Sequence, residues 1–387
     1  MKIVRLLPVT ALVAACVSGD APNATLPLAP SLAVSGAASG GQLYTMSNAT
    51  AGNEVIAFTR AADGALSAAG SYSTGGTGTG GGLGNQGALV IASRGRILLT
   101  VNAGSDQLSS FVIRGNGTLE LVSTVWSGGT MPVSVTADGS TVYALNAGGT
   151  GNISGFTLSA LGVLAPIAGS TLPLSGSAAG AAQISFAPNG RHLVVTEKTT
   201  NKLSIYRLQS NGTATGPAVV SSNGATPFGF AFRGAVLVVS EAFGGAADAS
   251  AASSYELRPN GTLITITASE PTLETAACWI AFSRNGRFAY TTNTGSGTIT
   301  GYLVSSGQLS RLNADGITAN VGAGTAPLDL AVSPDGRFIY SLNSGDESVS
   351  GWAINGDGSL AAIGGGVSGL IDGPTVWWRV DPLLTDL

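Results

Sequence analysis

Residues 327–343 read PLDLAVSPDGRFIYSLN, and this stretch decides the fold. It holds an apolar strand, a turn at Asp335-Gly336, and a second apolar strand that ends in Asn343. Asp-Gly pairs supply the positive φ angles that a tight hairpin turn requires. The chain continues as SGDESVSGWAINGDG, which adds a Gly/Ser loop, a strand containing Trp352 and a second glycine turn. The pattern predicts a small antiparallel sheet of short strands.

The same unit recurs along the chain. Residues 279–302 read WIAFSRNGRFAYTTNTGSGTITGY, and residues 184–197 read ISFAPNGRHLVVTE. The second strands of the units end roughly every 50 residues, which is the length of a four-stranded propeller blade. These strands end at Asn102, Asn146, Glu197, Glu241, Asn293 and Asn343. No unit contains a Trp-Asp dipeptide, so the repeat is not of the WD40 type.

The two ends of the repeat predict the blade count. Residues 42–47, 55–59 and 66–72 have the pattern of strands two to four of a blade without its opening strand. Residues 374–382 read PTVWWRVDP and have the pattern of an opening strand without successors. Joining them completes one blade and hides the sheet edges that an open array would expose. We therefore predict an all-β, seven-bladed β-propeller of four-stranded antiparallel blades over residues 41–382, closed by its C-terminal strand, with a tail at 383–387.

Composition excludes several classes of protein. The chain has 387 residues with 57 Gly, 44% hydrophobic and 10% charged residues, which suits strands and tight turns around an apolar core. A net charge of −4 with no basic cluster makes a nucleic-acid partner unexpected. One His and two Cys exclude a zinc site built on several His and a disulfide framework. We expect no cofactor, no metal and a monomer.

The N-terminus has the features of an export signal. Lys2 and Arg5 precede an apolar stretch at residues 6–15 that is too short to span a bilayer. The stretch ends in Val-Ala-Ala-Cys at residues 13–16, which resembles a bacterial lipobox and predicts lipidation of Cys16. The alternatives are ordinary cleavage near Cys16 or a Cys there by chance. We assign residues 1–16 to a signal peptide and 17–40 to a flexible tether. The protein is then a lipoprotein on the periplasmic or surface face of the cell envelope, attached to the membrane only by its lipid, or alternatively secreted.

The runs SPDGRFIY (333–340) and YTTNTGSGTI (290–299) resemble the lactonase-like seven-bladed propellers. That family includes bacterial 6-phosphogluconolactonases and fungal carboxymuconate-cyclising enzymes, and the resemblance covers nearly all of residues 41–382. It implies His, Arg and Glu side chains near the start of the innermost strands. This chain has Ala182-Gln183, Phe228-Gly229 and Cys278-Trp279 at those places, so no catalytic residue can be carried over.

A candidate site follows from propeller geometry, because innermost strands begin and second strands end on the same face around the axis. The predicted ligand-binding residues are Asn102, Asn146, Glu197, Lys198, Glu241, Cys278, Trp279, Asn293 and Asn343. Glu197 and Glu241 lie in adjacent blades, where close carboxylates would bind a cation or split their pKa values. In the alternative interpretation the Asn side chains bond the backbone, and the Glu and Lys side chains form a structural bridge.

Three further features have plain structural interpretations. Cys278 would be a nucleophile only with a Glu as its base, and a buried thiol beside Trp279 is the alternative. His192 matches Phe288 and Phe338 in other units, which favours a packing slot over catalysis. Residues 75–84 contain a Gly-x-Gly spacing without a βαβ unit, which indicates a loop between blades one and two and no nucleotide site.

The sequence thus leaves three functions open. The first is an exported propeller that binds a small polar ligand or acts as a scaffold at the cell envelope. The second is a lactonase of the 6-phosphogluconolactonase type with a rearranged site. The third is a platform for protein interactions, with an envelope protein as partner.

Overall fold

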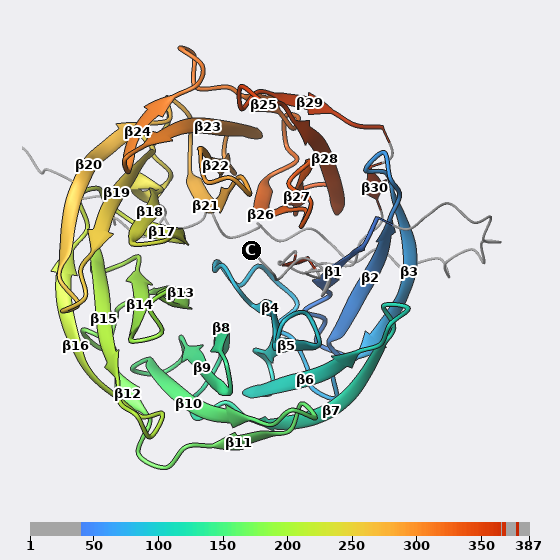
Figure 1. The fold of residues 1–387 in the computed structure, drawn as a ribbon, viewed down its shortest axis with the longest axis vertical. Coiled ribbons are helices and arrows are strands. Elements are labelled where there is room, and N and C mark those ends of the chain that lie inside the picture. Colours follow the sequence, from blue (N-terminus) through green and yellow to red (C-terminus); the bar gives the residue numbers. More distant parts are fainter. Residues whose placement is uncertain (1–39, 365, 369–376, 379–387) are drawn as a thin grey trace, which may run out of the picture.

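The computed structural model describes residues 40–364, 366–368 and 377–378, and within them the chain forms a closed ring of sheets (Figure 1). The predicted signal peptide, Cys16 and nearly all of the predicted tether lie outside the described residues, as does the C-terminal tail. The described elements are strands, apart from a 3₁₀ turn at Phe243–Gly245. No helix in this described part is long and apolar enough to cross a membrane.

The ring contains seven antiparallel sheets, as predicted. Blade 1 comprises β31 (Trp377–Trp378), β1 (Gln42–Met46), β2 (Glu54–Arg60) and β3 (Leu66–Ser73). Blade 2 comprises β4 (Leu89–Ala92), β5 (Ile97–Asn102), β6 (Gln107–Ile113) and β7 (Leu119–Trp126). Blade 3 comprises β8 (Pro132–Asp138), β9 (Thr141–Asn146), β10 (Asn152–Leu158) and an outer strand in two pieces, β11 (Leu164–Pro166) and β12 (Leu172–Pro173).

The other four blades repeat this order from the axis outward. Blade 4 comprises β13 (Ala181–Phe186), β14 (His192–Glu197), β15 (Lys202–Leu208) and β16 (Ala214–Ser221). Blade 5 comprises β17 (Pro227–Arg233), β18 (Val236–Glu241), β19 (Ala251–Leu257) and β20 (Leu263–Pro271). Blade 6 comprises β21 (Ala277–Phe282), β22 (Phe288–Asn293), β23 (Thr298–Ser305), β24 (Gln308–Arg311) and β25 (Ala319–Asn320). Blade 7 comprises β26 (Pro327–Val332), β27 (Phe338–Asn343), β28 (Ser348–Ile354), β29 (Leu360–Ala362) and β30 (Val367–Ser368).

The C-terminal strand closes the ring. β31 pairs antiparallel with β1, so that Trp378 lies opposite Leu43 and Trp377 opposite Tyr44. The composite blade expected from the sequence is therefore confirmed, with β31 as its innermost strand.

Strand direction defines two faces of the ring. Each inner strand begins, and each second strand ends, on what we call the upper face, which carries Asn102, Asn146, Glu197, Glu241, Asn293 and Asn343. The turns from inner to second strand and from third to fourth strand lie on the opposite, lower face. The core lies between adjacent blades, and every residue of β5, β14, β22 and β27 is buried.

A glycine joins each blade to the next at the lower face. In each blade the turn from third to fourth strand contains a glycine of positive φ, which packs on the first residue of the preceding blade's second strand. The pairs are Gly117 with Gln42, Gly162 with Ile97, Gly212 with Thr141, Gly261 with His192, Gly307 with Val236, Gly358 with Phe288 and Gly64 with Phe338. A β-carbon on Gly64, whose φ is +95°, would lie 2.7 Å from the Phe338 ring, so only glycine fits.

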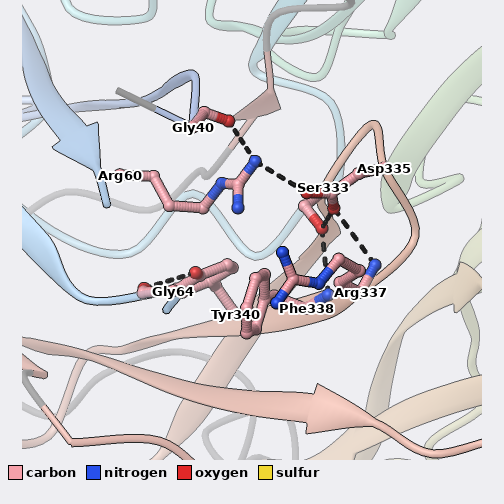
Figure 2. A network of polar contacts seen from close by, with 8 residues as sticks. All are labelled: Gly40, Arg60, Gly64, Ser333, Asp335, Arg337, Phe338 and Tyr340. Carbon is pink, nitrogen blue, oxygen red and sulfur yellow. Dashed lines mark hydrogen bonds and ion pairs between the residues drawn. The ribbon is translucent and has the colours of Figure 1, made fainter. Parts of the chain in front are cut away.

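Figure 2 shows this joint where blade 7 meets blade 1. The Tyr340 hydroxyl donates to the Gly64 carbonyl at 2.5 Å, and Arg60 forms an ion pair with Asp335 at 2.9 Å. Arg60 also donates to the Gly40 carbonyl, which places the beginning of the described chain on the lower face. The joint therefore ties the two ends of the repeat together beside the closing strand.

Candidate functional site

The predicted Asn and Glu residues lie where the sequence placed them, at the last position of the second strands. All six are buried, with no exposed area. Asn343 donates from Nδ2 to the hydroxyls of Ser348 and Ser350 at 2.9 Å each, and Asn293 makes the same pair of bonds to two threonines. These contacts fix the following hairpin through side-chain hydroxyls, whereas the structural interpretation expected bonds to the backbone.

Glu241 accepts four hydrogen bonds. Its Oε1 accepts from the Gly224 amide at 2.8 Å and from the hydroxyls of Ser222 and Ser253 at 3.3 and 2.5 Å. Its Oε2 accepts from the Ser269 hydroxyl at 2.6 Å. The carboxylate thus holds the loop that enters blade 5 against the third and fourth strands of the same blade.

Glu197 makes the corresponding contacts in blade 4. Its carboxylate accepts from the amide and hydroxyl of Ser175, from Thr200 at 2.9 Å and from Ser204 at 2.7 Å. None of these donors contacts Glu241, so each carboxylate is satisfied by its own blade. Their role in binding a ligand stays a prediction.

Lys198 follows Glu197 and turns toward the axis of the ring. Its Nζ donates to the Gly84 carbonyl and lies 4.7 Å from the centroid of the Phe228 ring. Burial lowers the pKa of the Lys198 ammonium to about 8, because the charged form is desolvated. Lys198 thus contacts a backbone carbonyl and the face of an aromatic ring.

Gly84 belongs to an unexpected feature, which we call the axial segment: residues 84–86, in the loop between blades 1 and 2. The Gln86 amide donates to the carbonyl of Ala182 in blade 4, and its side chain donates to Ile280 in blade 6, both at 3.1 Å. From blade 6, Trp279 Nε1 donates to the Asn85 carbonyl at 2.7 Å. The segment thus leaves the side of β4 and crosses toward the middle of the ring (Figure 1).

The axial segment is packed tightly among the starts of the inner strands. Asn85 has no exposed area and Gln86 is 4% exposed. Gly229 at the start of β17 leaves room for the segment, since a β-carbon there would lie 2.3 Å from Gln86 Oε1. The segment therefore covers the starts of the inner strands of blades 4, 5 and 6 with the protein's own residues.

Cys278 and Trp279 form part of the apolar packing beneath the segment. Both are buried, and the Trp279 and Phe228 rings are 5.1 Å apart. Cys278 is disulfide-bonded, so it is neither the nucleophile nor the buried thiol considered from the sequence. No three His, Cys, Asp or Glu side chains gather into a metal-binding group anywhere in the described part of the chain.

The lower face carries a groove of about 630 Å³ between the turns of blades 4 and 5. Its polar lining comes from Asn189, Arg191 and Glu256, and the rest is Ala, Pro, Gly and Leu. His192 lies beside it, 2% exposed and packed by Gly261. Burial lowers the pKa of His192, and the charges of Arg207 and Arg191 lower it further. The burial of His192 agrees with the packing role that the sequence predicts for it.

Comparison with known families agrees with the ring. The sequence matches the family described as "Lactonase, 7-bladed beta-propeller" over residues 38–167, 154–279 and 253–368. The chain belongs to this lactonase propeller family. No curated protein sequence matches it.

Solved structures of the same fold extend over nearly the whole ring. A candidate 6-phosphogluconolactonase from Bacteroides fragilis is 16% identical, with a TM-score of 0.71 over 87% of this chain and 97% of its own. The periplasmic gluconolactonase of Pseudomonas aeruginosa is 18% identical, with a TM-score of 0.69 over 88% and 99% of the two chains. A Lactobacillus plantarum protein gives 18% identity and a TM-score of 0.70 over 87% and 99%. At such identity the likeness concerns the fold.

This lactonase propeller differs from its family's expected pattern at the inner strands. The second and third residues of β13, β17 and β21 include Ala182, Phe228 and Cys278, and all three are buried. Gln183, which is not among the predicted site residues, donates from Nε2 to the Phe230 carbonyl and accepts from the Phe230 amide at Oε1. A glutamine in a run of apolar residues was the only signal for this contact.

Proposed function

We propose that this lactonase propeller is exported and works at the cell envelope as a binding or scaffolding module, not as a hydrolase. The observation that carries the proposal is the axial segment. Asn85 and Gln86 lie buried at the starts of inner strands, and Trp279 and Lys198 donate to the backbone carbonyls of Asn85 and Gly84. A lactone would have to displace this packed segment before it reached the starts of β13, β17 and β21.

The polar groups nearby also favour a non-catalytic role. Glu197 and Glu241 each receive four hydrogen bonds from protein donors, so both are fully engaged in holding loops. A general base must have a free lone pair directed at a substrate proton. The surface loops around the ring then offer the sites for a small polar ligand or an envelope protein.

Lactone hydrolysis is the second candidate, and membership of the lactonase family is the observation that favours it. In that case a carboxylate of the upper face would act as base in a rearranged site. The starts of β13, β17 and β21 carry Ala182-Gln183, Phe228-Gly229 and Cys278-Trp279 in place of His, Arg and Glu, which opposes this candidate.

One experiment separates the two. The purified chain is incubated with a panel of sugar lactones and carboxylated lactones, and ring opening is followed by acid release at constant pH. We expect no turnover above buffer. Turnover that disappears in Glu197→Gln or Glu241→Gln, while both variants stay folded, would overturn the proposal in favour of the hydrolase.

A further inference from the structure

Arginines gather on the lower face of the ring. Of the fourteen Lys and Arg residues in the described part of the chain, eleven lie in or beside the lower turns, against six carboxylates. Ten of these arginines are exposed, and they come from blades 2, 4, 5, 6 and 7. They are Arg94, Arg96, Arg114, Arg191, Arg207, Arg233, Arg258, Arg284, Arg287 and Arg337.

The upper face has the opposite balance. Of the described basic residues, only Lys198, Lys202 and Arg311 lie on its side of the ring, against eleven carboxylates. Although the net charge of the chain is −4, its two faces therefore carry net charges of opposite sign. Such a separation orients a protein in the field of a charged surface.

Most of the exposed arginines have no acidic partner. Ion pairs on the lower face join Arg60 to Asp335, Arg114 to Glu120, and Arg258 to Glu256. The other eight arginines form no ion pair with any described carboxylate. Guanidinium groups in this state bind phosphate oxygens well, because their planar fork donates two parallel hydrogen bonds.

The N-terminal chain joins the ring on the same face. β1 begins at Gln42 on the lower face, and the Gly40 carbonyl accepts a hydrogen bond from Arg60 there (Figure 2). Cys16 precedes Gly40 by only 24 residues. The N-terminal chain therefore joins the ring on the arginine-rich face.

We infer that the lower face docks on the anionic surface of a phospholipid bilayer, with headgroup phosphates bound by the unpaired arginines. The ring presents a broad disc (Figure 1), and the turns of blades 2, 4, 5, 6 and 7 that carry these arginines lie on one side of it. This inference rests on the proposed envelope location for its setting. It depends on the charge of the lower face alone, so it is testable without the lipid anchor.

The test uses the full chain with Cys16→Ser, purified without lipid. This protein is mixed with phospholipid vesicles, and the fraction that sediments with the vesicles is measured. One set of vesicles contains phosphatidylglycerol and the matched set is phosphatidylcholine alone. We expect binding to the anionic set only. Because the Debye length is about 10 Å at 0.1 M salt and shrinks as salt is added, binding should fall steeply with salt.

Charge variants then identify the face. A basic residue close to an anionic surface contributes roughly fivefold to binding, from about 1 kcal/mol each. Arg191→Gln with Arg207→Gln should therefore weaken binding by about 25-fold, since both side chains are exposed on the lower face. Lys202→Gln on the upper face is the control and should leave binding unchanged.

Several outcomes would overturn the inference. They are no binding to either set, equal binding to both sets, or an equal loss in the Lys202→Gln control. Circular dichroism and melting of each variant exclude a folding defect as the cause. A lipidated native protein whose unlipidated form ignores anionic vesicles would refute the docking face and leave the proposed function standing.

Discussion

The substitution Glu241→Gln tests whether the Glu241 carboxylate stabilises the fold or binds a ligand. Glutamine has the same shape, so its oxygen can keep the three donors on Oε1: the Gly224 amide and the hydroxyls of Ser222 and Ser253. Its NH₂ group replaces Oε2 and faces the Ser269 hydroxyl, which can rotate to accept. What is lost is the charge that strengthens these four bonds, while the desolvation cost of a buried carboxylate is also removed.

The expected cost is modest but measurable. We predict a loss of about 1–3 kcal/mol in the free energy of unfolding, within the range for a partner lost to a buried polar group. For a chain of this size each kcal/mol lowers the melting temperature by about 2 °C. Glu241→Ala should cost about 3–5 kcal/mol, because it leaves the Gly224 amide without an acceptor and opens a cavity.

The control is Glu54→Gln, at the start of β2 on the upper face. The Glu54 side chain is partly exposed and makes no hydrogen bond to the described residues, so its loss should change stability by less than about 0.5 kcal/mol. Melts are run with and without calcium and with lactone candidates. If Glu241→Gln melted like the wild type but lost stabilisation by one of these ligands, the structural account of the carboxylate would be refuted.

Three further predictions follow from the ring and its termini. His192→Phe should remove a loss of stability in acid. Because the pKa of His192 is lowered in the folded protein, the unfolded chain binds the proton more readily, and the free energy of unfolding falls as pH drops below about 6.5. Urea melts at pH 5 and pH 7 measure the difference. A variant that kept the full acid slope would contradict this role. Deletion of residues 373–387 removes β31 and should lower the melting temperature of the whole ring, since it opens two sheet edges, and an unchanged melt would contradict closure by the C-terminus. Cys16→Ser should shift the protein from the membrane fraction to a soluble or unprocessed form, whereas a soluble wild type without lipid would rule out the lipobox interpretation.

The fold could be predicted because its determinants are local. Turns such as Asp335-Gly336 fix a hairpin within a few residues, and the alternation of the flanking strands fixes which side faces the core. Closure was also predictable, because one unit lacked its first strand and the chain ended with a strand lacking successors. The contacts of the glycine turns could not be predicted, because Gly64 and Phe338 are far apart in sequence and only the closed ring brings them together.

The site was predictable in position but not in environment. Glu241 and Glu197 lie at the strand ends as expected, yet their partners come from loops and outer strands whose serines carry no pattern of their own. The axial segment gave still less signal. Asn85 and Gln86 stand at the edge of a glycine-rich run, and their partners Trp279 and Ile280 lie 194 residues away. The sequence could not show that a loop between two blades crosses to the middle of the ring.

Hydrogen exchange of the axial segment tests the central claim most directly. The Gln86 amide donates to the Ala182 carbonyl in the buried middle of the ring, so its exchange requires an opening of the packed segment. We predict that a peptide covering residues 83–88 exchanges as slowly as the peptides from β14 and β22. Rapid exchange of this peptide, with those strands still protected, would mean that the segment leaves the axis and that the starts of the inner strands are open to a substrate.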